Sequence, residues 1–200
     1  MRERVVAAAA AAEEGGVAQA MVLVEQFRGV NPVDPWVRLL DAKNLTARRL
    51  FGSAEALLRA IETPAEVSPE SQNEWRYVWL YRWAKLWDMR GEREAAEAAY
   101  RELTEVEAAQ AGGWIFLGAW LARNGRLEEA EAAHRRATSL AGDVDEAYLN
   151  LGLVLRAQGR LEEAAGALER ALELCAEYPE ASVALADVRA AIALRREHQA

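Results

Sequence analysis

Large apolar residues recur three and four positions apart along much of the chain, which places them on one face of a helix. Trp83 and Trp87 show this spacing, as do Leu117 and Leu121. Each such stretch ends a few residues later in a glycine, the residue that most readily takes the left-handed backbone that closes a helix. The pattern predicts helices joined by short turns and no strand.

The same pattern returns every 34 residues. The sequence GRLEEA occupies 125–130 and again 159–164, and GEREAA occupies 91–96. Gly118 and Gly152 fall at equivalent positions, and Ala84 precedes them by one period. These residues are small because a neighbouring helix is expected to pass close by. Since one such repeat cannot bury its own apolar face, we expect the copies to stack.

A period of 34 with this order of large, small, glycine and alanine positions resembles the tetratricopeptide repeat. The resemblance implies an all-α fold, an α-solenoid of antiparallel helical hairpins in a right-handed superhelix, with about eleven helices. It assigns three repeats to residues 69–176 and a capping helix, near 179–197, to residues 177–200.

Residues 1–62 read as degenerate hairpins of the same type. Helices are expected near 2–14, 17–29, 35–50 and 54–62, with Gly52 and Ser53 forming the last turn and 63–68 a seam. The opening segment, with two arginines before an alanine run, also resembles a signal peptide. Because the run ends in Glu13 and Glu14 without a convincing cleavage site, we interpret it as a helix.

Four tryptophans occur every fourth residue from Trp75 to Trp87. They could form an aromatic cage for a cation or a peptide, but their positions match the core of the repeat. We therefore interpret the four tryptophans as core residues. Tyr77 and Tyr81 lie between them, and the sequence does not decide whether these two pack or bind a ligand.

The net charge of −8 lies entirely in residues 63–200, since residues 1–62 hold eight acids and eight bases. An acidic chain without a basic cluster argues against nucleic acid as a partner. No apolar stretch is long enough to span a bilayer. The single cysteine, Cys175, excludes an internal disulfide and favours the reducing cytoplasm, and the arginine bias fits a GC-rich bacterial genome.

No residue pattern indicates catalysis, a cofactor or a metal. His134 and His198 are the only histidines, and His134 is expected to pack across its hairpin. Cys175 has no histidine nearby, and Gly112-Gly113 reads as a turn between repeats, not as a phosphate loop. An enzyme is therefore not expected.

The family resemblance places a peptide-binding groove on the first helix of each repeat and implies a scaffold or adaptor that binds a protein or peptide. The alternative is a scaffold that forms homo-oligomers. Asn150 matches one position of the chaperone-tail clamp found in part of the family, but the other positions differ, so we do not expect that ligand. A partner segment that is both apolar and acidic would suit the matching positions, which are Val78, Tyr81, Arg82, Lys85, Ile115, Phe116, Ala119, Arg123, Leu149, Asn150, Leu153 and Arg156.

Overall fold

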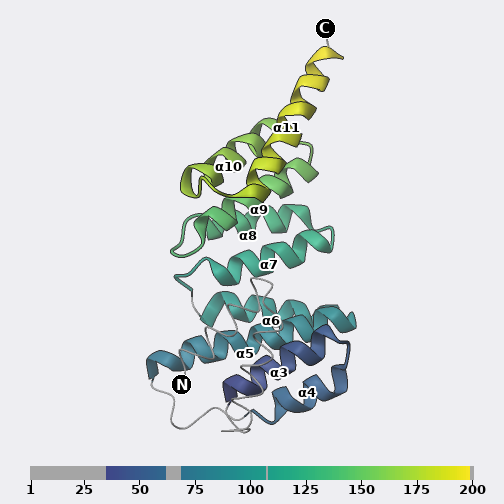
Figure 1. The fold of residues 1–200 in the computed structure, drawn as a ribbon, viewed down its shortest axis with the longest axis vertical. Helices are drawn as coiled ribbons and strands as arrows, with labels where there is room; N and C mark the ends of the chain where they lie inside the picture. Colours follow the sequence, from purple (N-terminus) through teal and green to yellow (C-terminus); the bar gives the residue numbers. More distant parts are fainter. Residues whose placement is uncertain (1–34, 62–68, 107, 199–200) are drawn as a thin grey trace. The chain divides into compact units, whose positions relative to one another are not determined.

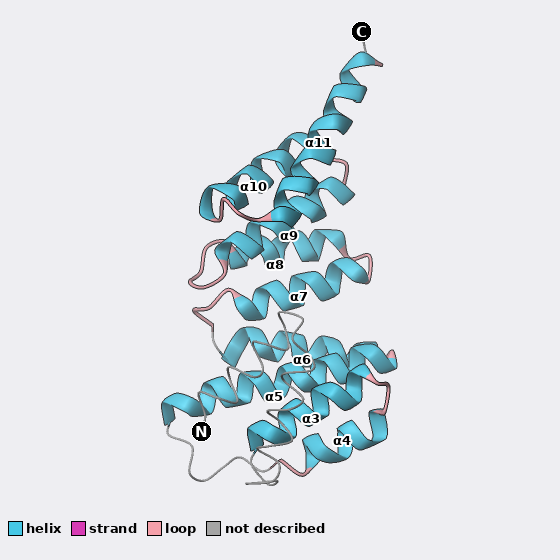
Figure 2. Ribbon diagram, viewed as in Figure 1, coloured by secondary structure: helices cyan, strands magenta, loops and turns pink. Residues whose placement is uncertain are grey.

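The structure, a computed structural model, describes residues 35–61, 69–106 and 108–198. This part of the chain holds nine helices and no strand (Figures 1 and 2), which confirms the all-α fold class. Two of the about eleven expected helices, near 2–14 and 17–29, lie outside the described residues. The helices are α3 (Pro35–Ala47), α4 (Phe51–Arg59), α5 (Pro69–Arg90), α6 (Arg93–Val106), α7 (Gly112–Arg123), α8 (Leu127–Ala137), α9 (Val144–Ala157), α10 (Leu161–Leu174) and α11 (Pro179–Glu197).

The chain divides into two compact units, with the boundary between Ala99 and Tyr100, inside α6. In the N-terminal unit α3 packs against α4, and α5 packs against both. In the C-terminal unit each helix from α7 to α11 packs against the next one. The division into 1–62, 69–176 and 177–200 that the repeat pattern suggests stays a prediction.

Three glycines close the first helix of their repeats in the expected way. Gly91, Gly125 and Gly159 have φ angles of 82°, 78° and 77°. At the second of them, the Gly125 N–H donates to Ala122 O at 3.0 Å and the next N–H, of Arg126, donates to Leu121 O at 3.0 Å. This pair of bonds satisfies carbonyls that the helix end would leave without a partner.

Arg49 closes α3 in the same way, although it is not a glycine. Its φ is 59°, its N–H donates to Thr46 O at 2.9 Å, and the Leu50 N–H donates to Leu45 O at 2.9 Å. The predicted turn at Gly52 and Ser53 is wrong, because both residues lie in the first turn of α4. We expected a glycine in the turn, because an arginine in the left-handed conformation costs roughly 1–2 kcal/mol and is rare.

Aligning Arg49 with Gly91 shows that α3 and α4 carry the repeat pattern. The two residues are 42 positions apart, eight more than the period of 34, which is why the register was hidden. Where the later repeat has Ala84, Ala96, Tyr100 and Leu103, this hairpin has four residues that are all buried: Ala42, Ala54, Leu58 and Ile61.

The row of tryptophans on α5 is mainly core, as predicted. Trp75 and Trp83 are each 5% exposed and belong to one apolar cluster with Leu39 and Leu58, while the half-buried Trp79 and Trp87 pack against it. The Trp79 indole donates a hydrogen bond to the carbonyl of Leu58 at 3.2 Å. Neighbouring rings stack or meet edge to face at centroid distances of 4.8–6.1 Å. These contacts tie α5 to the α3–α4 hairpin.

The small positions lie at close helix contacts, as predicted. A Cβ atom on Gly118 would lie 2.6 Å from Cε1 of His134, and one on Gly152 would lie 2.6 Å from Cγ of Leu168. Gly113 is equally tight, with 2.7 Å to the carbonyl oxygen of Leu103. The interpretation of Gly112-Gly113 as a turn is wrong, because both residues begin α7. Only a residue without a side chain fits where Gly113 meets the backbone of α6.

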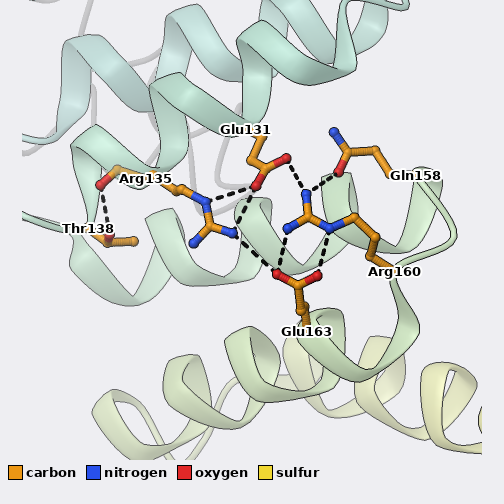
Figure 3. A network of polar contacts seen from close by, with 6 residues as sticks. All are labelled: Glu131, Arg135, Thr138, Gln158, Arg160 and Glu163. Carbon is orange, nitrogen blue, oxygen red and sulfur yellow. Dashed lines mark hydrogen bonds and ion pairs between the residues drawn. The ribbon is translucent and has the colours of Figure 1, made fainter.

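Ion pairs join the α7–α8 hairpin to the α9–α10 hairpin (Figure 3). Arg160, in the turn before α10, binds Glu131 of α8 at 2.6 Å and also Glu163 of α10. Arg135 binds Glu131 at 2.8 Å and approaches Glu163 at 3.6 Å. Burial would raise the pKa of the Glu131 carboxyl, but hydrogen bonds from Arg160 and Arg135 lower it below its usual range.

Two glycine substitutions should have opposite effects on stability. Gly118→Ala should destabilise the protein by about 1–3 kcal/mol, because the new methyl group overlaps the His134 ring. Gly166→Ala is the matched control: it lies in α10 with nothing within 4 Å of its Cβ position, so alanine should stabilise the helix by about 1 kcal/mol. Urea denaturation measures both changes. A neutral or stabilising Gly118→Ala would show that the helices do not meet there.

Candidate functional site

In the N-terminal unit, four predicted groove residues lie on α5, and all are half-buried. Val78 packs against the apolar cluster of this unit. The other three line a pocket of about 380 Å³ between α3 and α5, whose lining among the described residues is Lys43, Thr46, Ala47, Tyr81, Arg82, Lys85 and Met89. Sequence reasoning missed the α3 wall of this pocket, because the register of α3 was hidden.

Most polar groups of this α3–α5 pocket are hydrogen-bond donors with positive charge. Lys43, Arg82 and Lys85 line it together. The Arg82 guanidinium lies 5.4 Å from the centre of the Tyr81 ring, within cation–π range. The Thr46 hydroxyl donates to Ala42 O at 2.8 Å. The described part of the lining therefore carries three positive charges and no negative one.

The C-terminal unit holds the other eight predicted residues, on α7 and α9, and they differ in exposure. Ile115 and Leu149 are only 2% and 7% exposed and belong to core clusters, so they can contribute to a groove only as its floor. Phe116 and Leu153 are half-buried. Ala119 and Asn150 are half-buried as well, whereas Arg123 and Arg156 are exposed.

Two pockets lie beside these residues. The first, of about 280 Å³, brings Ala119 and Arg123 of α7 together with Asn150 and Leu153 of α9. The second, of about 430 Å³, lies between α9 and α11, where Leu153 and Arg156 meet Val183 and Asp187. Leu153 lines both pockets. The first pocket therefore brings together predicted residues of α7 and α9, and the second brings predicted residues of α9 next to α11.

Helix α11 forms a wall of the second pocket. Its bounds, Pro179–Glu197, agree with the helix expected near 179–197. Val183 is 64% exposed and lies 34 residues after Leu149, and Asp187 lies 34 after Leu153. The period thus contained the signal that α11 stands where the first helix of another repeat would stand.

The charges of the α9–α11 pocket are partly compensated within the chain. The Arg156 guanidinium lies 3.5 Å from the Asp187 carboxylate. Nearby on α9, burial raises the pKa of the Glu146 carboxyl, and Asp143 raises it further, while a hydrogen bond from Asn150 opposes the shift. Arg156 and Asn150 therefore already have partners in the chain, and this end of the predicted groove offers mainly apolar surface.

Among the described residues, no three or more His, Cys, Asp or Glu side chains are placed to hold a metal ion. Nor does this part of the chain contain a helix long and apolar enough to cross a membrane. Cys175 is a free, half-buried thiol at the end of α10.

Residues 110–177 match the family model described as tetratricopeptide repeat. This segment therefore carries the sequence pattern of the tetratricopeptide repeat. No curated protein sequence matches the chain. Proteins of this family are generally protein-interaction scaffolds, not enzymes.

Solved structures of other tetratricopeptide repeat proteins share the fold. A thermophilic one from Thermus thermophilus aligns with a TM-score of 0.71 and 20% identity, covering 94% of this chain and 97% of that one. Another, from Parabacteroides merdae, has a TM-score of 0.71 and 16% identity, covering 93% and 70%. The first such domain of Spaghetti (RPAP3), bound to an HSP90 peptide, has a TM-score of 0.54 and 23% identity, covering 59% and 94%.

His134 borders the α7–α9 pocket and is almost completely buried, with 1% exposure. It packs across its hairpin on Gly118, as predicted. Its Nδ1 atom is buried without a hydrogen-bond partner. Burial lowers the pKa of the imidazole to about 4, because the charged form loses its hydration.

We expect His134 to make the fold sensitive to acid. The unfolded state binds a proton at a pKa near 6.5 and the folded state only near 4, so the free energy of unfolding should fall between pH 7 and pH 4. This one group should account for about 3 kcal/mol. His134→Leu, which copies Leu168 beside Gly152, should remove that part of the pH dependence, as urea denaturation at a series of pH values would show.

His198→Leu, at the exposed end of the chain, serves as the control and should keep the pH dependence of the parent. Equal losses of stability in the parent and in His134→Leu over the same pH range would contradict this account.

Proposed function

We propose that this chain is a scaffold or adaptor that holds an apolar and acidic segment of a partner protein against the first helices of its repeats. The helices concerned are α5 in the N-terminal unit, and α7, α9 and α11 in the C-terminal unit. The free Cys175 thiol suits the cytoplasmic setting expected from the sequence.

The observation that carries the proposal is apolar surface beside the two pockets of the C-terminal unit. Leu153 lines both pockets, and Val183 remains 64% exposed at the second. Large apolar side chains left open next to a concave surface mark sites where a partner binds. A structure of similar fold, the Spaghetti domain, was determined with a bound peptide.

Self-association is a second candidate function, favoured by exposed apolar residues near the C-terminal end. Leu174 is 48% exposed on α10, and Leu194 is 56% exposed on α11. A second copy of the chain could cover them. Light scattering over a range of concentrations separates this candidate from a monomeric adaptor.

Peptides selected from a displayed random library supply a ligand for the test. Leu153→Ala and Phe116→Ala should each weaken the selected peptides by about 1–3 kcal/mol in calorimetric titration, because they remove apolar contact surface at the proposed site. Leu174→Ala, an exposed leucine on a second helix, is the matched control and should bind like the parent.

Thermal melting of each variant checks that the fold is intact. If the selected peptides bind both variants as tightly as the parent, the first helices of the C-terminal unit are not the binding surface. If the variants instead shift the oligomeric state, self-association is the better description.

A further inference from the structure

The α7–α8 and α9–α10 hairpins close at the same repeat position with different side chains. His134 of α8 and Leu168 of α10 are 34 residues apart, and they are 1% and 0% exposed. Each packs on the small residue of its first helix, His134 on Gly118 and Leu168 on Gly152. Histidine gains a charge near neutral pH, whereas leucine never does. The C-terminal unit therefore contains one titratable helix contact and one copy of it that does not titrate.

The contact at Gly118 suits only the neutral imidazole. The ring edge formed by Nδ1, Cε1 and Nε2 of His134 lies 2.6–2.8 Å from the position that a Cβ atom on Gly118 would take. The Nδ1 atom is buried without a hydrogen-bond partner. A charged imidazole donates from both nitrogens and needs an acceptor or water at each. Protonation of His134 therefore favours an arrangement in which α8 moves away from α7 and water reaches the ring.

The charged groups on the neighbouring helices do not stabilise a charged imidazole. Helix α8 packs against α7 and α9. Arg123 is the only charged residue of α7, and its charge is positive. None of the titratable residues of α9 lines the pocket that His134 borders; they are Asp145, Glu146, Tyr148 and Arg156. Burial lowers the pKa of His134, and no carboxylate raises it.

Two carboxylates on α8 and α9 have perturbed pKa values, and both can be told apart from His134. Despite burial, hydrogen bonds from Arg160 and Arg135 lower the pKa of Glu131 on α8 (Figure 3), so Glu131 stays charged at pH 5. Burial raises the pKa of Glu146 on α9, so acid neutralises a charge that the fold disfavours and strengthens the closed form. The remaining charged residues of α8 are all exposed: Glu128, Glu129, Arg135 and Arg136. Among these groups, only His134 weakens the hairpin between pH 7.5 and pH 5.

The same imidazole forms part of a pocket wall. Leu127 and His134 are the α8 residues that line the α7–α9 pocket, together with Ala119 of α7 and Leu153 of α9. When α8 moves away from α7, this wall is lost. Opening of the contact at Gly118 therefore also opens the pocket.

We infer that acid opens the α7–α8 contact at Gly118 locally, before the α9–α10 hairpin opens, and so dismantles the pocket between α7 and α9. The α9–α10 hairpin stays closed because Leu168 does not titrate. As a regulation of the proposed binding site, the inference rests on the proposed function, whereas the local opening itself does not.

Hydrogen exchange measures the opening directly, because a backbone amide exchanges when its helix opens. A group with a pKa of 6.5 in the open form and about 4 in the closed form raises the opening equilibrium about thirtyfold between pH 7.5 and pH 5. Mass spectrometry, corrected for the intrinsic exchange rate at each pH, should therefore show that the protection of α8 amides falls about thirtyfold. The protection of α10 amides, on the equivalent second helix, should change much less.

Exchanging the two side chains between the hairpins tests the assignment. His134→Leu should make the protection of α8 as insensitive to pH as that of α10. Leu168→His should make α10 sensitive to acid, and if this variant does not fold, the comparison of His134→Leu with the parent decides. His198→Leu, at the exposed end of the chain, should respond like the parent.

A bound peptide tests the link to the pocket. A ligand that needs the closed pocket favours the closed form, and acid must weaken that ligand in return. The probe is a peptide from the displayed library whose affinity depends on Leu153. At pH 5, a saturating amount of it should restore the protection of α8 amides in the parent.

Each other outcome overturns a defined part of the inference. Equal loss of protection in α8 and α10 of the parent would show that acid causes no local opening. Persistent acid sensitivity of α8 in His134→Leu would assign the opening to another group. A peptide that binds but leaves α8 unprotected would reject the regulation of the site. If no library peptide binds while α8 responds to acid as described, the proposed function fails and the local opening stands.

Discussion

The close approach of the two helices in each hairpin, at one small residue, is the constraint on which the other features depend. Gly118 admits the His134 ring, and Gly152 admits Leu168. Ala119 and Leu153, which directly follow these glycines in the sequence, line the pocket between α7 and α9, and His134 borders it as well. A wider contact would move the pocket walls and the buried imidazole together.

Much of the fold could be predicted from the sequence, because a glycine closes the first helix in each of the three regular repeats. The first described hairpin could not, since Arg49 closes its turn and α5 has 22 residues where α9 has 14, which lengthens the spacing by eight. The pocket between α3 and α5 was missed for the same reason. Exposure was harder to predict than position: Ile115 and Leu149 have the expected register, but neighbouring helices bury both.

The two units present different chemistry at equivalent positions of the repeat. Lysine stands in the N-terminal unit where alanine or leucine stands in the C-terminal unit. In the C-terminal unit, Arg156 is already engaged by Asp187. Changing single residues on a fixed helical frame is the way a repeat fold acquires specificity, because the frame tolerates exchange on its outer faces.

The ion pairs between hairpins have a consequence for how the protein comes apart. Arg160 and Glu131 join one hairpin to the next, and the side chain of Glu131 is only 15% exposed, so salt screens this link less than it screens a surface pair. In a linear array, the links between neighbours determine whether the members melt together or one after another. Acid, which protonates Glu131 and removes this link, therefore makes the hairpins unfold less cooperatively, whereas added salt has a smaller effect.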